Sequence, residues 1–97
     1  MSARSTVQID NEHVRAVRWT LAEGDQIDEH RHEYPYIVVP LASGVMQITT
    51  SAGEQSSAEM VQGVCYHREA GAQHTIRNAG TGDLDFVEIE IFTSIPG

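Results

Sequence analysis

A two-residue alternation of apolar and polar side chains, in short runs broken by turn residues, most constrains what this chain can fold into. In the run 14–21, Val17, Trp19 and Leu21 alternate with polar residues. Successive side chains of a strand point to opposite faces, so this run predicts a half-buried strand. Since no run of ten residues carries the apolar spacing of a helix, we expect an all-β domain of about eight short strands.

Prolines and small polar residues divide the rest of the chain into similar runs. The apolar run 36–39 lies between Pro35 and Pro40, inside a segment from 27 to 41 that we expect to be extended. Small polar residues at 51–57 predict a hairpin loop. The pattern is typical of antiparallel sheets joined by tight turns, as in a sandwich or a small barrel.

The last alternating run follows the strongest turn in the sequence, at residues 78–83. In this run Val87 and Ile89 alternate with Glu88 and Glu90. We therefore expect a strand with one wet face that carries the two carboxylates, and a buried face that carries the apolar residues.

The charge of the chain excludes several classes of function. Fourteen acidic residues stand against six arginines and no lysine, which gives a formal net charge of -8 over 97 residues. Such a chain repels polyanions, so we expect neither nucleic acid nor a membrane as a partner. The absence of lysine also excludes Schiff-base catalysis and a phosphate-binding loop that ends in lysine.

The length predicts one domain over residues 1–97, with a core from about 13 to 93. No stretch approaches 18 apolar residues and the first six residues lack an apolar segment, so we expect a cytoplasmic location. Cys65 has no cysteine partner within the chain, which fits a reducing compartment. Its position predicts a small buried apolar side chain.

The histidines provide the strongest candidate chemistry. His30 and His32 are two residues apart in an extended segment, so both rings are expected on one face, and His74 is the natural third ligand. Neutral imidazole binds Zn, Fe, Ni and Cu well, and three rings leave coordination positions open. A solvated polar stretch at His30–His32 is the alternative, because short motifs often occur by chance.

The spacing of glycines around these histidines resembles the two motifs of the cupin superfamily. The matching positions of the first motif are Gly24, His30, His32 and Gly44, and those of the second are Gly63, Gly71, His74 and Asn78. The resemblance implies a small double-stranded β-helix, the jelly-roll barrel of cupins. It also implies that His30, His32 and His74 hold a divalent transition metal such as Fe, Ni, Zn or Mn.

Two positions depart from the cupin pattern. The first-motif glutamate, usually the fourth metal ligand, is replaced by Tyr36 or Ile37, depending on the spacer, and Glu69 stands where the second motif has proline. We therefore expect a three-histidine site with water in the remaining positions. The run 30–41 further resembles very small bacterial cupins, some of which are named β-alanine degradation proteins.

Three further residues are candidates for catalytic roles. Tyr36 shares the predicted face of the histidines, and Tyr66 and Arg68 share a face on the strand before the second motif. Tyr36 is a candidate acid or base, and Tyr66 and Arg68 are candidates for placing a substrate, with Arg68 as a fork for a carboxylate. Core packing of the tyrosines, Tyr34 included, and a solvated Arg68 are the alternatives.

Taken with the cupin resemblance, these residues predict a metal-dependent enzyme for a small carboxylate or an amino-acid-derived metabolite. A metal-dependent dioxygenase or a related small-molecule enzyme is one such possibility. The alternative is a non-catalytic module that binds or senses a small molecule, and the missing glutamate ligand favours it. Either protein is expected to be a homodimer, because a second copy covers the edge strands of so small a sheet.

Overall fold

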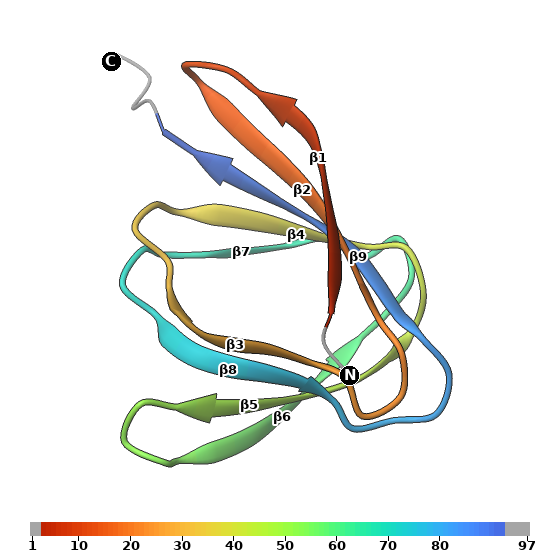
Figure 1. Cartoon of the computed structure of the whole chain (residues 1–97). Coiled ribbons are helices and arrows are strands. Elements are labelled where there is room, and N and C mark those ends of the chain that lie inside the picture. Colours follow the sequence, from red (N-terminus) through yellow and green to blue (C-terminus); the bar gives the residue numbers. More distant parts are fainter. Residues whose placement is uncertain (1–2, 93–97) are drawn as a thin grey trace.

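The computed structural model describes residues 3–92, which form nine β-strands and no helix (Figure 1). No helix that is long and apolar enough to cross a membrane occurs among these residues. In chain order the strands are β1 (Arg4–Asp10), β2 (Val14–Leu21), β3 (Gln26–Arg31), β4 (Tyr36–Pro40), β5 (Gly44–Thr50), β6 (Gln55–Met60), β7 (Tyr66–Arg68), β8 (Gln73–Asn78) and β9 (Leu84–Ile91).

The strands form two antiparallel sheets, so the predicted all-β jelly roll is confirmed. The larger sheet has the order β1-β2-β9-β4-β7, and the smaller one has the order β3-β8-β5-β6. In Figure 1 the hairpin of β1 and β2, together with the end of β9, extends beyond the smaller sheet. The chain changes sheet repeatedly, which places residues from both cupin-like motifs on neighbouring strands, β3 beside β8 and β4 beside β7.

Several strand predictions differ from the structure in their boundaries. The run 14–21 is β2 as predicted, with Val17 and Leu21 buried. The segment from 27 to 41 is not one strand, because it leaves the smaller sheet after Arg31 and enters the larger sheet at Tyr36. The predicted loop at 51–57 is shorter, since β6 begins at Gln55. A further strand, β1, precedes the expected start of the core and is exposed along its whole length.

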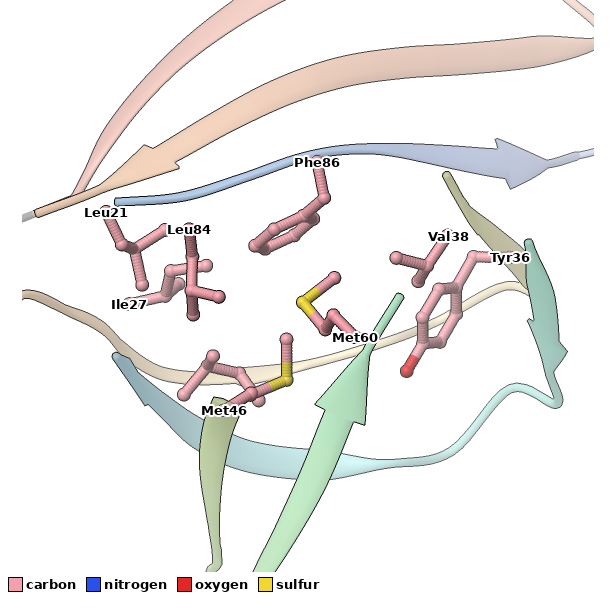
Figure 2. Packing of buried hydrophobic residues seen from close by; sticks show 9 residues of the cluster. Leu21, Ile27, Tyr36, Val38, Met46, Met60, Leu84 and Phe86 are labelled. Atoms are coloured by element: carbon pink, nitrogen blue, oxygen red, sulfur yellow. The ribbon is translucent and has the colours of Figure 1, made fainter. Parts of the chain in front are cut away.

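The core lies between the two sheets, where apolar side chains from both point toward one another (Figure 2). Phe86 and Leu84 of β9 meet Met46 and Met60 of the smaller sheet, and all four are at most 5% exposed. Burial of side chains of this size contributes about 1.5–3 kcal/mol each. The motif glycine Gly44 belongs to this packing, because a Cβ atom there would lie 2.6 Å from Leu84 Cδ2.

The predicted orientation of β9 is wrong. Glu88 shares the inward face with Leu84 and Phe86, while Val87 and Ile89 lie on the outer face and are only partly buried. Alternation alone does not say which of the two faces of a strand meets the core. The prediction chose the face with more apolar residues, and the structure buries the other one.

Candidate metal centre

The three predicted histidines meet at one place between the sheets. His30 and His74 are paired directly across β3 and β8. The Nε2 atom of His32 lies 3.0 Å from His30 Nε2 and 3.2 Å from His74 Nε2. Two nitrogens that each lie about 2.1 Å from one ion at right angles are about 3.0 Å apart. The spacing of these atoms therefore fits three ligands on one face of a metal ion.

His32 follows the end of β3, and a turn of the other motif holds it in place. The His32 N–H donates to Ala72 O at 2.8 Å, and the Gly71 N–H donates to His32 O at 2.8 Å. Gly71 has a φ of 108°, a conformation that disfavours residues with a side chain. Tyr36 stacks on the His32 ring with the ring centroids 4.0 Å apart. The turn and the tyrosine thus fix both the backbone and the ring of His32.

The outer nitrogen of His30 has its own partner, since His30 Nδ1 lies 2.8 Å from Asp28 O. Only a protonated Nδ1 can donate to a carbonyl, so this contact selects the tautomer with a free lone pair on Nε2. Ring nitrogens opposite a metal are commonly bonded in this way. His30 is therefore prepared to bind an ion through the nitrogen that faces the other two rings.

The environment keeps two of the three rings neutral. Burial, and then the neighbouring His30 and His74, lower the pKa of His32 to about 4. Burial and His30 also lower the pKa of His74. Metal ions bind the unprotonated ring, so at neutral pH no proton has to leave His32 or His74 for an ion to bind.

A cavity of about 190 Å³ lies beside the centre. Its polar lining residues are Tyr36, Tyr66, Arg68, Glu69, His74 and Glu88. Apolar core residues such as Val38 and Phe86 form the rest of the wall. The predicted catalytic residues therefore share one cavity with a histidine of the centre, although their roles stay a prediction.

Arg68 lies at the exposed end of this cavity. Its guanidinium is 4.5 Å from the centre of the Tyr66 ring, and Arg68 Nη1 donates to His67 O at 3.0 Å. A guanidinium that stacks on an aromatic ring still has N–H groups at its edge that can donate hydrogen bonds to another group. Arg68 can thus reach an anion at the mouth while its charge remains partly hydrated.

Both tyrosines keep their protons at neutral pH. Burial, followed by the Glu88 carboxylate, raises the pKa of Tyr36 to about 12. Burial is also the main cause that raises the pKa of Tyr66, and Arg68 opposes it. The two phenols are therefore hydrogen-bond donors toward the cavity.

Glu88 is a residue of the site that sequence reasoning missed. Its carboxylate Oε2 lies 3.8 Å from His32 Nε2, and its side chain is 16% exposed. Burial first and Glu90 second raise the pKa of Glu88 to about 7, while the Trp19 indole lowers it. Since the His32 ring is neutral at pH 7, the contact between Glu88 and His32 is not an ion pair. The signal that could have found Glu88 is its parity with Phe86, the largest apolar side chain of β9.

A second hollow opens on the other side of the same carboxylate. This groove has a volume of about 320 Å³ and is lined by residues of β1, β2, β3 and β9. Its wall includes His30, His32, Arg15 and Glu90, and Glu88 borders both the groove and the cavity. Residues of the candidate centre therefore line two hollows, His74 in the cavity and His30 and His32 in the groove.

Three other residues have structural or peripheral positions. Tyr34 is 41% exposed and packs edge-on against Phe92. Cys65 is exposed, so its predicted burial is wrong, and the reason is that it precedes the short strand β7 in a loop. Asn78 is buried and donates to Leu21 O and Gly82 O, so this motif residue ties the turn after β8 to the end of β2.

Comparison with protein families finds a match to the Cupin domain over residues 17–90. The β-alanine degradation protein BauB of Pseudomonas aeruginosa is 41% identical over 86 residues, which cover 89% of this chain and 90% of that protein. The resemblance to very small bacterial cupins of this type is thereby confirmed.

Solved structures give the same result for the fold. A cupin domain from Bordetella pertussis Tohama I is 38% identical, with a TM-score of 0.88 and 93% of both chains covered. The polyketide cyclase RemF of Streptomyces resistomycificus has a TM-score of 0.71 at 13% identity, covering 98% of this chain and 68% of its own. At that identity the likeness concerns the fold alone.

Proposed function

This chain belongs to the cupin domain family, and from that premise we propose that it is a metal-dependent enzyme for a small carboxylate. The observation that carries the proposal is the meeting of three imidazole Nε2 atoms beside a cavity that also contains Tyr36, Tyr66 and Arg68. A divalent transition metal on His30, His32 and His74 would supply Lewis-acid or redox chemistry. The protein side chains would bind, orient and protonate the substrate.

The cavity limits the size of the substrate. A volume of about 190 Å³ is below the roughly 300–1,000 Å³ of pockets that take drug-sized ligands. The wall is mostly apolar, with its donors at Tyr36, Tyr66 and Arg68. Such a cavity suits a metabolite of a few carbon atoms with one charged end.

The charged end is proposed to be a carboxylate. Arg68 is the one arginine among the residues that line the cavity, and a guanidinium binds a carboxylate through two parallel hydrogen bonds. The name of the Pseudomonas aeruginosa relative supports β-alanine and related three-carbon acids as the first compounds to test. In the proposed reaction Arg68 holds the carboxylate, and Tyr36 donates a hydrogen bond near the reacting atom.

The test combines metal analysis with ligand assays on untagged protein. We expect about one transition-metal ion per chain in the wild type and little in His74→Ala. We expect Arg68→Gln to keep the metal and to weaken carboxylate binding by about ten- to hundredfold, which corresponds to a lost charge-assisted bond. The matched control is Arg77→Gln, which removes an exposed arginine of β8 and should change neither quantity.

The ligand panel contains β-alanine and 3-oxo and 3-hydroxy acids of three to five carbons. Binding is measured by thermal shift, and turnover is measured by loss of the compound in NMR spectra. Thermal shifts without turnover would mean a binding module in place of an enzyme. A wild type without bound metal, and an unchanged melting temperature in His74→Ala, would contradict the metal centre itself.

We also propose a cytoplasmic homodimer. An exposed free thiol at Cys65 is best tolerated in a reducing compartment. The outer face of the larger sheet carries apolar side chains where a face open to water usually carries polar ones. Ala16, Ile37 and Ile89 form one row across this face, and Val39 and Val87 pair beside it. Ala16 is already buried, and a second copy of the same face would cover the partly exposed Ile37, Val39, Val87 and Ile89.

A further inference from the structure

The position of Glu88 carries an inference that rests on the proposed metal centre and goes beyond it. We propose that Glu88 is the carboxylate ligand of the metal, supplied by β9 in place of the glutamate that the first cupin motif lacks at Tyr36. Strand β9 lies next to β4, so a carboxylate lost from one strand can be replaced from its neighbour.

The register of the two strands brings the carboxylate to the required place. Tyr36 is opposite Glu90, and Val38 is opposite Glu88, with both members of each pair on the inward face. The Tyr36 ring stacks on His32, while the Glu88 carboxylate approaches the same imidazole at its Nε2 end. The tyrosine thus occupies the motif position, and the carboxylate lies one strand away.

The nitrogen that Glu88 faces distinguishes a ligand from an orienting group. A carboxylate or carbonyl oxygen that only orients a histidine ligand bonds the ring nitrogen that points away from the metal, as the backbone carbonyl of Asp28 does for His30 Nδ1. Glu88 instead faces His32 Nε2, which also lies 3.0 Å and 3.2 Å from the Nε2 atoms of the other two rings. Its oxygen is therefore on the side where the three rings converge.

The distance between Glu88 and His32 is compatible with a shared ion. Two donors at right angles around one ion are about 3.0 Å apart, and donors at wider angles are farther apart. Two donors on opposite sides of one ion are about 4.2 Å apart. The distance of 3.8 Å between Glu88 Oε2 and His32 Nε2 lies between these two limits. Glu88 also borders both hollows, so its carboxylate lies between the cavity and the groove.

A carboxylate ligand would alter the chemistry of the centre. Three neutral imidazoles leave the full charge of a divalent ion on the site, whereas one carboxylate reduces it by one unit. Imidazole with carboxylate also suits Mn and Fe better than imidazole alone. Glu88 would therefore help to determine which metal the site holds.

Cobalt titration of metal-free protein tests the role of Glu88. The absorption of Co²⁺ in the visible range reports its ligands, and competition with a chelator gives its affinity. We expect Glu88→Gln to weaken Co²⁺ binding by at least about tenfold and to change the visible spectrum. The control Glu59→Gln, which removes an exposed carboxylate of β6, should leave both unchanged.

Two additional variants separate the possible failures. His74→Ala should abolish tight Co²⁺ binding, and formate should restore affinity to Glu88→Ala by filling the vacated carboxylate position. If Glu88→Gln binds Co²⁺ with wild-type affinity and spectrum while His74→Ala does not bind it, the role of Glu88 is disproved and the centre stands. If the wild type does not bind Co²⁺ at all, the proposed centre fails together with this ligand.

Discussion

The buried carboxylate of Glu88 makes the metal-free protein sensitive to pH. Folding raises the pKa of this group from 4.5 to about 7, so the folded state holds its proton more tightly than the unfolded state does. When folding raises the pKa of an acid, the free energy of unfolding of the protein falls as pH rises from the unfolded pKa through the folded pKa. The loss is complete above pH 7 and absent below pH 4.5.

Glu88→Gln is therefore expected to stabilise the metal-free protein at pH 8. A glutamine keeps the shape and does not ionise, and each pKa unit corresponds to about 1.4 kcal/mol, so the gain has an upper limit of about 3 kcal/mol. Urea unfolding with a chelator present, at pH 8 and at pH 4.5, measures it. His32 contributes a slope of opposite sign, since its pKa is lowered, but both proteins share it. A gain of equal size at both pH values would contradict the prediction.

At the scale of residues, the sequence predicted the histidines and missed the carboxylate. His30 and His32 belong to the first cupin motif and His74 to the second, and the spacing of residues within each motif was enough to predict them. Glu88 belongs to no such motif, and its proposed role depends on the neighbouring strand β4 and on which face of β9 is inward. Pairing between strands distant in sequence is not written in a local pattern.

At the scale of elements, the turn between β7 and β8 belongs to the second motif and forms hydrogen bonds with His32 of the first motif. Two backbone hydrogen bonds join Gly71 and Ala72 of this turn to His32. Gly71→Ala forces a residue with a side chain into a φ of 108°. We expect a loss of stability of about 1–3 kcal/mol and a weaker metal affinity, because relaxation of the turn moves His32.

Gly53→Ala is the matched control for this prediction. Gly53 has a φ of 86° in the turn between β5 and β6 and has open space around it. It should cost a similar amount of stability in urea unfolding and leave Co²⁺ affinity unchanged. Equal losses of Co²⁺ affinity in Gly71→Ala and Gly53→Ala would mean that the turn at Gly71 does not position His32.

Predictions of the elements were best where alternation and turn residues agreed. Strand β2 matched its predicted run, whereas the segment 27–41 was expected to be continuous and is divided between two sheets. The chain changes sheet around His32, in a polar stretch whose path depends on hydrogen bonds to the distant turn at Gly71. Strand β1 pairs at the edge of the larger sheet and is exposed, so it has little buried pattern to detect.

At the scale of the whole molecule, the apolar outer face of the larger sheet predicts the proposed dimer. We expect sedimentation to show a dimer for the wild type and a monomer for Ile89→Glu, because two carboxylates would be buried in a symmetric interface. The control Val64→Glu changes an exposed valine in the loop between β6 and β7 and should remain dimeric. Circular dichroism confirms that each variant is folded, and a monomeric wild type would contradict the assignment.

Because Glu88 borders both the cavity and the groove, we expect the two hollows to act as separate entrances to the proposed centre. A metabolite seated beside Arg68 would not block a smaller reactant, such as water or dioxygen, that arrives along β1 and β2. If both reactants take part, steady-state kinetics should follow random-order addition, without a compulsory first partner.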